Sequence, residues 1–289
     1  MAELLKGKPV VDSMALDLRA RIEALGRAKV VPALALVRVG QRPDDLSYER
    51  TARKRAESLG IAIRPYELDE FAPQAAIEAA IHEVNRDENV HGCLLFRPLP
   101  SFVDESHMCE LLDPKKDIDG ITLASLASVF TDGHAGYPPA TAAACIQLLD
   151  HYQVPLQGKH VVVVGRSLVV GKPVSMMLLR RNASVTICHS KTENLADIMR
   201  SADVVICATG RARTFGAQFF GPGQTVLDVG INFDTQGNLC GDVDFAEVEP
   251  VVAAITTVPG GIGTVTTSVT MAHTVAAAEA ALAARTGRR

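Results

Sequence analysis

The chain has 289 residues, of which 47% are hydrophobic and 21% charged, and its formal net charge is -4. This length suits one large domain or two ordinary ones, and the small negative charge gives no support to a nucleic-acid or anionic-membrane partner. No apolar run is long enough to cross a bilayer, and the N-terminus has no signal-peptide core, so we expect a cytoplasmic protein. The six cysteines are scattered without a CxxC pair, and the eight histidines lack ligand spacing. We therefore predict free thiols and no metal site.

Strands and helices alternate along the first part of the chain. The spacing of apolar residues predicts helices over 11–25, 47–59, 74–85 and 104–112. Strands are predicted over 32–39, 61–68 and 90–96. This alternation is typical of an α/β layer with a parallel sheet.

Residues 131–139 are rich in glycine and proline and separate a second region. Helices are predicted there over 141–152, 173–182, 194–201 and 267–284. The predicted strands are 160–164, 184–188, 203–207, 224–230 and 253–256. The last helix is rich in alanine, and we expect that face to pack on the first region.

The run Val161–Val164 reads as a strand buried on both faces, and Gly165 ends it. Gly171 follows six residues later, and Pro173 suits the first turn of a helix. A strand, a tight turn and a helix start can place backbone N–H groups against a phosphate. Ser167 stands where the usual dinucleotide fingerprint has a second glycine, so the pattern alone fits either a nucleotide site or an ordinary βα unit.

The end of the next strand indicates which dinucleotide would bind. An acidic residue there favours NAD, whereas basic or small polar residues accept the additional phosphate of NADP. The strand ends in Cys188-His189-Ser190-Lys191, without an acid. Ser190 and Arg166 could bind a phosphate, so we favour NADP. The alternative is that Arg166 and Lys191 are ordinary surface charges.

Several stretches taken together resemble one family, the FolD-type methylenetetrahydrofolate dehydrogenase/methenyltetrahydrofolate cyclohydrolases of one-carbon metabolism. In the first region they are Ser47-Tyr48, Arg97-Pro-Leu-Pro100 and Lys116-Asp-Ile-Asp-Gly120. In the second they are Val164-Gly-Arg-Ser167, Val170-Gly-Lys-Pro173, His189-Ser-Lys-Thr192, Asp228-Val-Gly-Ile-Asn232, Gly241-Asp-Val243 and Val258-Pro-Gly-Gly-Ile-Gly263. Each motif is modest, but their order and spacing match over nearly the whole chain.

The resemblance implies two lobes around a cleft. Residues 1–140 would form an α/β folate-binding lobe on which residues 267–289 pack, and residues 141–266 a Rossmann-like NADP-binding domain. A homodimer through the nucleotide lobe is also implied. The implied cofactor-binding residues are Gly165, Arg166, Ser167, Gly171, Ser190 and Ile231.

The same resemblance assigns substrate residues. Tyr48 would stack on the folate and Asp119 would hold the pterin, while Phe96, Pro259, Gly260 and Gly261 would line the substrate site. Without the resemblance, Tyr48 reads as a half-buried helix tyrosine and Asp119 as a turn residue before Gly120.

The chain departs from the family at its catalytic positions. The lysine that runs the cyclohydrolase step falls on Ala52, and the glutamine that supports it falls on Phe96. Lys54 points elsewhere on the helix, while Arg55, on roughly the same face, could supply charge but is a poor proton carrier. Two smaller differences are Pro139-Ala-Thr-Ala142, where the family has Pro-Cys-Thr-Pro, and Thr257, where it has proline.

Hydride transfer mainly needs orientation, whereas hydrolysis of the methenyl product needs water activation and a proton relay. We therefore predict an NADP-dependent methylenetetrahydrofolate dehydrogenase with weak or absent cyclohydrolase activity. The alternatives are a divergent relative with an altered folate-like substrate and a catalytically silent folate- or NADP-binding protein.

Overall fold

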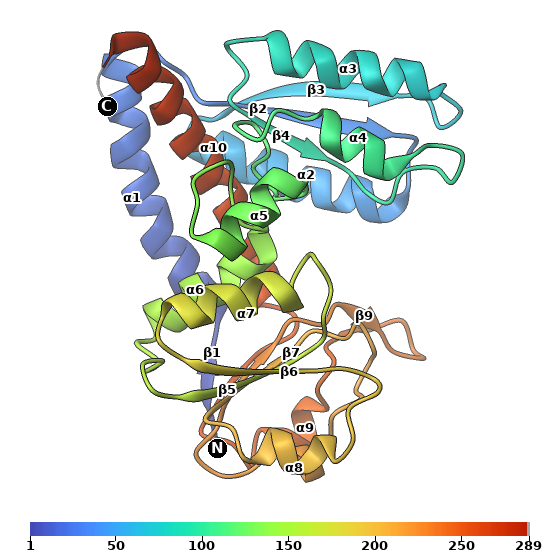
Figure 1. The fold of residues 1–289 in the computed structure, drawn as a ribbon, viewed down its shortest axis with the longest axis vertical. Coiled ribbons are helices and arrows are strands. Elements are labelled where there is room, and N and C mark those ends of the chain that lie inside the picture. Colours follow the sequence, from blue (N-terminus) through green and yellow to red (C-terminus); the bar gives the residue numbers. More distant parts are fainter. Residues whose placement is uncertain (288–289) are drawn as a thin grey trace. The chain divides into compact units, whose positions relative to one another are not determined.

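The computed structural model describes residues 1–287 and divides them into two compact units (Figure 1). The six-stranded unit comprises Met1–Asp12 and Thr141–Thr266. The three-stranded unit comprises Ser13–Ala140 and the described residues from Thr267 on. The boundaries at 12/13 and 266/267 fall inside helices α1 (Gly7–Arg27) and α10 (Ile262–Thr286).

The three-stranded unit is built on a parallel sheet in the order β3-β2-β4. Its strands are β2 (Ala33–Val39), β3 (Ala62–Leu68) and β4 (Gly92–Leu95). Its other helices are α2 (Pro43–Leu59), α3 (Gln74–Arg86), α4 (Glu105–Leu111) and α5 (Leu123–Thr131). Alternation along β2 separates two buried clusters: Leu34 and Leu36 face α1, α2 and α10, whereas Ala35 and Val37 face α3 and α4 (Figure 1).

The six-stranded unit has one parallel sheet in the order β1-β11-β8-β7-β5-β6. Its strands are β1 (Glu3–Leu5), β5 (His160–Val164), β6 (Ser184–Cys188), β7 (Val204–Cys207), β8 (Thr225–Asp228) and β11 (Ala254–Thr256). Helices α6 (Ala140–His151) and α7 (Gly171–Arg180) lie on one face, and α8 (Leu195–Arg200) and α9 (Phe245–Val248) on the other (Figure 1). The 3-10 turn η1 (Ala217–Phe219) and the antiparallel pair β9 (Asn232–Phe233) and β10 (Leu239–Cys240) complete it.

The N-terminal residues correct the expected domain range of 1–140. Strand β1 pairs in parallel with β11, so Glu3 lies opposite Ala254, and Met1–Asp12 belong to the six-stranded unit. Three residues are too few to show a strand period, and their partner lies about 250 positions away in the sequence.

Several helices also differ from the prediction, and α1 begins at Gly7 rather than 11. Helix α2 begins at Pro43 rather than 47, because proline is favoured at the first helical position and Asp44 and Asp45 fill the first turn. Helix α5 was not predicted; the Thr122 hydroxyl caps it by accepting from the Ser125 N–H at 3.1 Å. Helix α10 begins at Ile262 rather than 267.

The six cysteines are all buried free thiols. Within residues 1–287, no helix is both long and apolar enough to cross a membrane. The same residues hold no group of three or more His, Cys, Asp or Glu side chains that could bind a metal.

Candidate functional site

A cavity of about 310 Å³ lies at the carboxyl ends of β5, β6 and β7. Strand β5 lies between β6 and β7, so the order in which strands are added to the sheet reverses beside β5. In parallel α/β sheets this switch point, outside the carboxyl ends, is where ligands bind. The lining residues are Val164, Gly165, Arg166, Ser167, His189, Ser190, Leu195, Ala208, Thr209, Arg211, Thr214 and Phe215.

The cavity brings together four predicted cofactor residues, Gly165, Arg166, Ser167 and Ser190. Its lining includes two arginines and no carboxylate, which suits an anion-rich ligand such as a dinucleotide phosphate. Arg211 was missed in the sequence. Its position just after β7 could have identified it, because the carboxyl ends of the parallel strands β5 and β7 lie at the same edge of the sheet.

Two glycines let the loop after β5 close tightly. Gly165 has φ +130°, and a Cβ there would lie 2.2 Å from the Ala208 carbonyl oxygen. A Cβ on Gly171 would lie 2.1 Å from the Gly165 carbonyl oxygen. Gly171 is therefore buried behind the loop, outside the cavity lining, and begins α7. The Ser167 hydroxyl accepts from the Val170 N–H at 3.1 Å, which holds the turn.

Two buried aspartates fix the neighbouring loops without any cationic partner among the described side chains. Asp242 accepts hydrogen bonds from the backbone N–H groups of Thr209, Gly210 and Arg211 and from the Asn232 side chain. Asp228 accepts from the backbone N–H groups of Gly230, Asp242 and Val243 at 2.9 to 3.0 Å. Burial raises the pKa of Asp228 to about 6, against the lowering effect of those N–H groups. This pair positions Arg211 at the cavity.

The remaining predicted residues of this unit lie on loops outside the cavity lining. Ile231 follows β8 and is 64% exposed. Pro259 and Gly260 are exposed, and the Gly260 carbonyl accepts from the Gly7 N–H at 2.7 Å. Gly261 is buried, and a Cβ there would lie 2.5 Å from the Thr257 carbonyl oxygen.

The three-stranded unit brings Tyr48, Phe96 and Asp119 together. Tyr48 on α2 meets Phe96 edge-on, with ring centroids 6.0 Å apart and an interplanar angle of 73°. Burial, followed by the charge of Asp119, raises the pKa of Tyr48 to about 12. Hydrogen bonds from the Thr267 and Thr270 side chains on α10 oppose that shift. No local sequence pattern could reveal these threonines, because they lie more than 200 positions from Tyr48.

The two aspartates of the Lys116–Gly120 turn have different surroundings. Asp117 is fully buried and accepts from the Ile121 and Thr122 N–H groups and from the Ser125 hydroxyl, at 2.6 to 2.9 Å. Asp119 is half-buried and makes no hydrogen bond within residues 1–287, so its oxygens can accept from a ligand. Burial raises the pKa of Asp119 to about 7; the Arg97 guanidinium lowers it and the Asp117 carboxylate raises it further.

Ala52 lies on the side of α2 that faces the sheet. Its exposure is 0%, and it shares a buried cluster with Leu36, Ala56 and Phe96. Position 52 is therefore closed to solvent, beside Phe96 and Tyr48. Arg55 is half-buried and Lys54 exposed. The cation that acts electrostatically on Asp119 is Arg97, whose side chain is 26% exposed and lies 3.6 Å from Glu105.

Comparison with known proteins covers both units. The profile of the family described as "Tetrahydrofolate dehydrogenase/cyclohydrolase, catalytic domain" matches residues 5–119, and that of the "NAD(P)-binding domain" of the same description matches residues 139–282. A protein of Carboxydothermus hydrogenoformans named "Bifunctional protein FolD" is 48% identical over 281 residues, covering 96% of this chain and 98% of the relative.

Solved structures agree with this match. The bifunctional FolD methylenetetrahydrofolate dehydrogenase/cyclohydrolase of Campylobacter jejuni superposes with a TM-score of 0.94 at 33% identity, covering 97% of this chain and 99% of that one. The Trypanosoma brucei FolD enzyme, solved with NADP and an inhibitor, has a TM-score of 0.91 at 30% identity and covers 97% and 98% of the two chains. The predicted resemblance and the two-domain α/β fold with parallel sheets are confirmed.

Proposed function

Because this chain belongs to the tetrahydrofolate dehydrogenase/cyclohydrolase family, we propose that it oxidises methylenetetrahydrofolate to methenyltetrahydrofolate with NADP. The observation that carries the proposal is the cavity beside β5, which has two arginines, no carboxylate and a loop closed by Gly165 and Gly171. This arrangement fits a phosphorylated dinucleotide.

Different residues in and around the cavity would bind different parts of NADP. Arg166 and Ser190 would hold the additional phosphate of NADP, since a guanidinium and a hydroxyl suit a dianion and no acid competes. The first N–H groups of α7 would face the diphosphate. Ile231, beyond the end of β8, would border the cofactor, and Gly171 acts by shaping the loop. When bound, NADP supplies the hydride acceptor.

The three-stranded unit would bind the folate. Asp119 has free carboxylate oxygens that can accept from the amino and ring N–H groups of a pterin. Tyr48, held by Thr267 and Thr270 and by the edge of Phe96, offers a rigid ring face for stacking. Pro259, Gly260 and Gly261 complete the proposed substrate residues. Pro259 and Gly260 are exposed.

We further propose that hydrolysis of the methenyl product is weak or lost. The residue at the lysine position is Ala52, which is fully buried, and its neighbour in the cluster is Phe96 rather than an amide. Neither can move a proton, and general acid–base help is worth about 100- to 10,000-fold. Arg97 and Arg55 can stabilise negative charge, but a guanidinium is a poor proton carrier.

The test is to follow NADPH formation and methenyltetrahydrofolate decay separately. We expect cofactor reduction with accumulation of the methenyl product, whose decay matches the rate without protein. Arg166→Ala should weaken NADP about tenfold and leave NAD unchanged. Equal use of NAD by the wild type would contradict the cofactor assignment, binding without turnover would show a silent protein, and fast decay would contradict the loss of hydrolysis.

A homodimer through the six-stranded unit is part of the proposal. Strand β6 is an edge of the sheet, and Ile187 on β6 and Leu179 on α7 are 37% and 49% exposed. An uncovered edge strand with apolar neighbours suits pairing with a second copy. Sedimentation of the wild type and of Ile187→Glu would test it, and a monomeric wild type would rule it out.

A further inference from the structure

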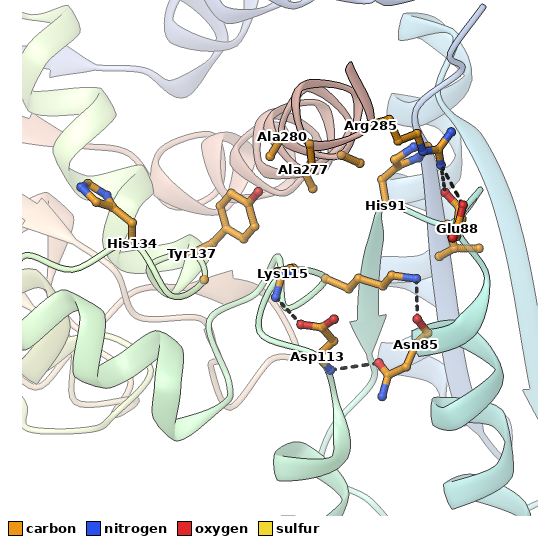
Figure 2. Close-up of a pocket in the computed structure, with 15 residues that line it drawn as sticks. Asn85, Glu88, His91, Asp113, Lys115, His134, Tyr137, Ala277, Ala280 and Arg285 are labelled. Carbon is orange, nitrogen blue, oxygen red and sulfur yellow. Dashed lines mark hydrogen bonds and ion pairs between the residues drawn. The ribbon is translucent and has the colours of Figure 1, made fainter. Parts of the chain in front are cut away.

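A cavity of about 580 Å³ in the three-stranded unit (Figure 2) is lined by none of the proposed folate-site residues. Val90 and His91, which line it, come just before β4, whereas Phe96 follows the same strand. The cavity is therefore at the amino end of β4, and Tyr48, Phe96 and Asp119 do not line it. Nothing in the proposed dehydrogenase reaction uses it.

One side of this cavity is lined by small and aromatic side chains. Apart from Arg285 near its end, α10 lines the cavity with small side chains, those of Ala277, Ala280, Ala281 and Ala284. Tyr137 forms a facing wall and is held in place because its ring stacks on His273, with centroids 5.0 Å apart and 29° between planes. A cavity of this size accommodates a small organic ligand.

The cavity lining also includes a histidine whose Nε2 is open to it. His91 is 6% exposed, and its Nδ1 accepts from the Ala33 N–H at 3.1 Å, so the ring proton is on Nε2. Within residues 1–287, that Nε2 has no hydrogen-bond partner. Burial, Arg285 and Lys116 lower the pKa of His91, so it is a neutral donor. This N–H is therefore free to donate to a ligand in the cavity.

The charges around the cavity favour an anion. Lys116 Nζ donates to the Val84, Asn85 and Asp87 carbonyls at 2.6 to 3.0 Å, so its charge is fixed but its donors are used. Arg285 donates to the Glu88 carbonyl at 2.8 Å (Figure 2). Lys115 is exposed and has no ion-pair partner among residues 1–287. Three cations face the two carboxylates of Glu88 and Asp113, which leaves one net positive charge.

We propose that this cavity binds a flat, mainly apolar small molecule that carries one anionic group. The alanine face of α10 and the Tyr137 ring would enclose the flat part, while His91 Nε2 and the Lys115 ammonium would bind the anion. The site goes beyond the dehydrogenase reaction and does not depend on it.

Two probes of equal shape test the proposal, 2-naphthoate and its neutral amide, titrated calorimetrically into the protein with NADP saturating. We expect saturable binding of naphthoate and about tenfold weaker binding of the amide. Lys115→Gln should weaken naphthoate about fivefold without changing the amide. The same change at an exposed lysine elsewhere, Lys54→Gln, should change neither. Ala281→Trp should remove binding of both probes by filling the cavity.

Three results would overturn the proposal. One is absence of saturable naphthoate binding to the wild type. Another is unchanged binding to Ala281→Trp and to Ala284→Trp, the latter at an exposed position that does not endanger folding. The third is a wild-type dimer that either tryptophan dissociates in sedimentation, since this face would then be covered by a second copy.

Discussion

The nucleotide-type cavity is formed mainly by backbone groups, whereas the proposed folate site is formed by side chains. Backbone forms the first: Gly165 closes against the Ala208 carbonyl, and buried Asp228 and Asp242 bind loop N–H groups. Side chains from separate elements form the second, with Tyr48 on α2, Phe96 after β4 and Thr267 on α10. A site made of backbone tolerates few residue types, whereas a site made of side chains can change its chemistry one residue at a time. The departures at Ala52 and Phe96 fall in the second kind.

The largest expected effect comes from a substitution that disrupts the loop of the nucleotide-type cavity. Gly165→Ala places a Cβ 2.2 Å from the Ala208 carbonyl oxygen at φ +130°, so the loop or β7 must move. A shift of about 1 Å can cost on the order of a hundredfold, and we expect the KM for NADP to rise at least that much. Steady-state kinetics measures it.

Gly158→Ala is the matched control for Gly165→Ala. Gly158 also has a positive φ, +74°, but a Cβ there meets nothing within 4 Å. We expect about 1 kcal/mol of lost stability from backbone strain and an unchanged KM for NADP. Similar kinetic losses in both variants would show that strain, not the close approach to Ala208, explains the first result.

The second effect tests whether the lysine and glutamine of the family, placed at positions 52 and 96, restore hydrolysis. Ala52→Lys with Phe96→Gln should speed hydrolysis of methenyltetrahydrofolate roughly tenfold to a hundredfold, because a lysine and an amide act as one unit. Ala52→Lys alone should do little and destabilise the protein, since position 52 is fully buried among apolar side chains. Decay of the methenyl compound with each variant gives the result. Equal gains from the single and double changes would contradict the coupling.

These contrasts also explain what the sequence could predict. Regular alternation and the glycine pattern predict both parallel sheets and the loop at Gly165, because these depend on local spacing. Strand β1 and the threonines beside Tyr48 depend on partners more than 200 positions away, which no local pattern reveals. The complete burial of Ala52 was not predicted, because an alanine fits either a buried or an exposed helix face.

The third effect separates the two neighbouring aspartates. Asp119→Asn replaces one acceptor by a donor at a carboxylate with no partner among residues 1–287, so we expect folate affinity to fall about tenfold with little change in stability. Asp117→Asn is the control, because Asp117 binds three donors at the start of α5. It should lower the free energy of unfolding by about 1–3 kcal/mol. Substrate titrations and thermal unfolding distinguish the two, and unchanged folate affinity in Asp119→Asn would place the pterin elsewhere.

The smallest effect is a pH dependence of folate binding. Because burial raises the pKa of Asp119 to about 7, the folded protein keeps a proton that the unfolded chain, with its ordinary value of 3.8, has released. The stability contribution of this group therefore falls as pH rises from about 4 to 7, while its capacity to accept from the pterin increases. Folate affinity should accordingly improve as pH rises through about 7.

Arg97→Leu sharpens this pH prediction. The Arg97 guanidinium lowers the pKa of Asp119, so removing it should move the midpoint to higher pH and weaken folate binding at pH 7 about threefold. In Asp119→Asn the profile should be flat. Asp228 titrates in a similar pH range, with a pKa of about 6. It belongs to the six-stranded unit, so its titration should affect NADP binding instead. Folate binding titrated from pH 5.5 to about 8.5 in the three proteins decides the matter. A midpoint that Arg97→Leu leaves in place would show that the charge of Arg97 does not reach the pterin carboxylate.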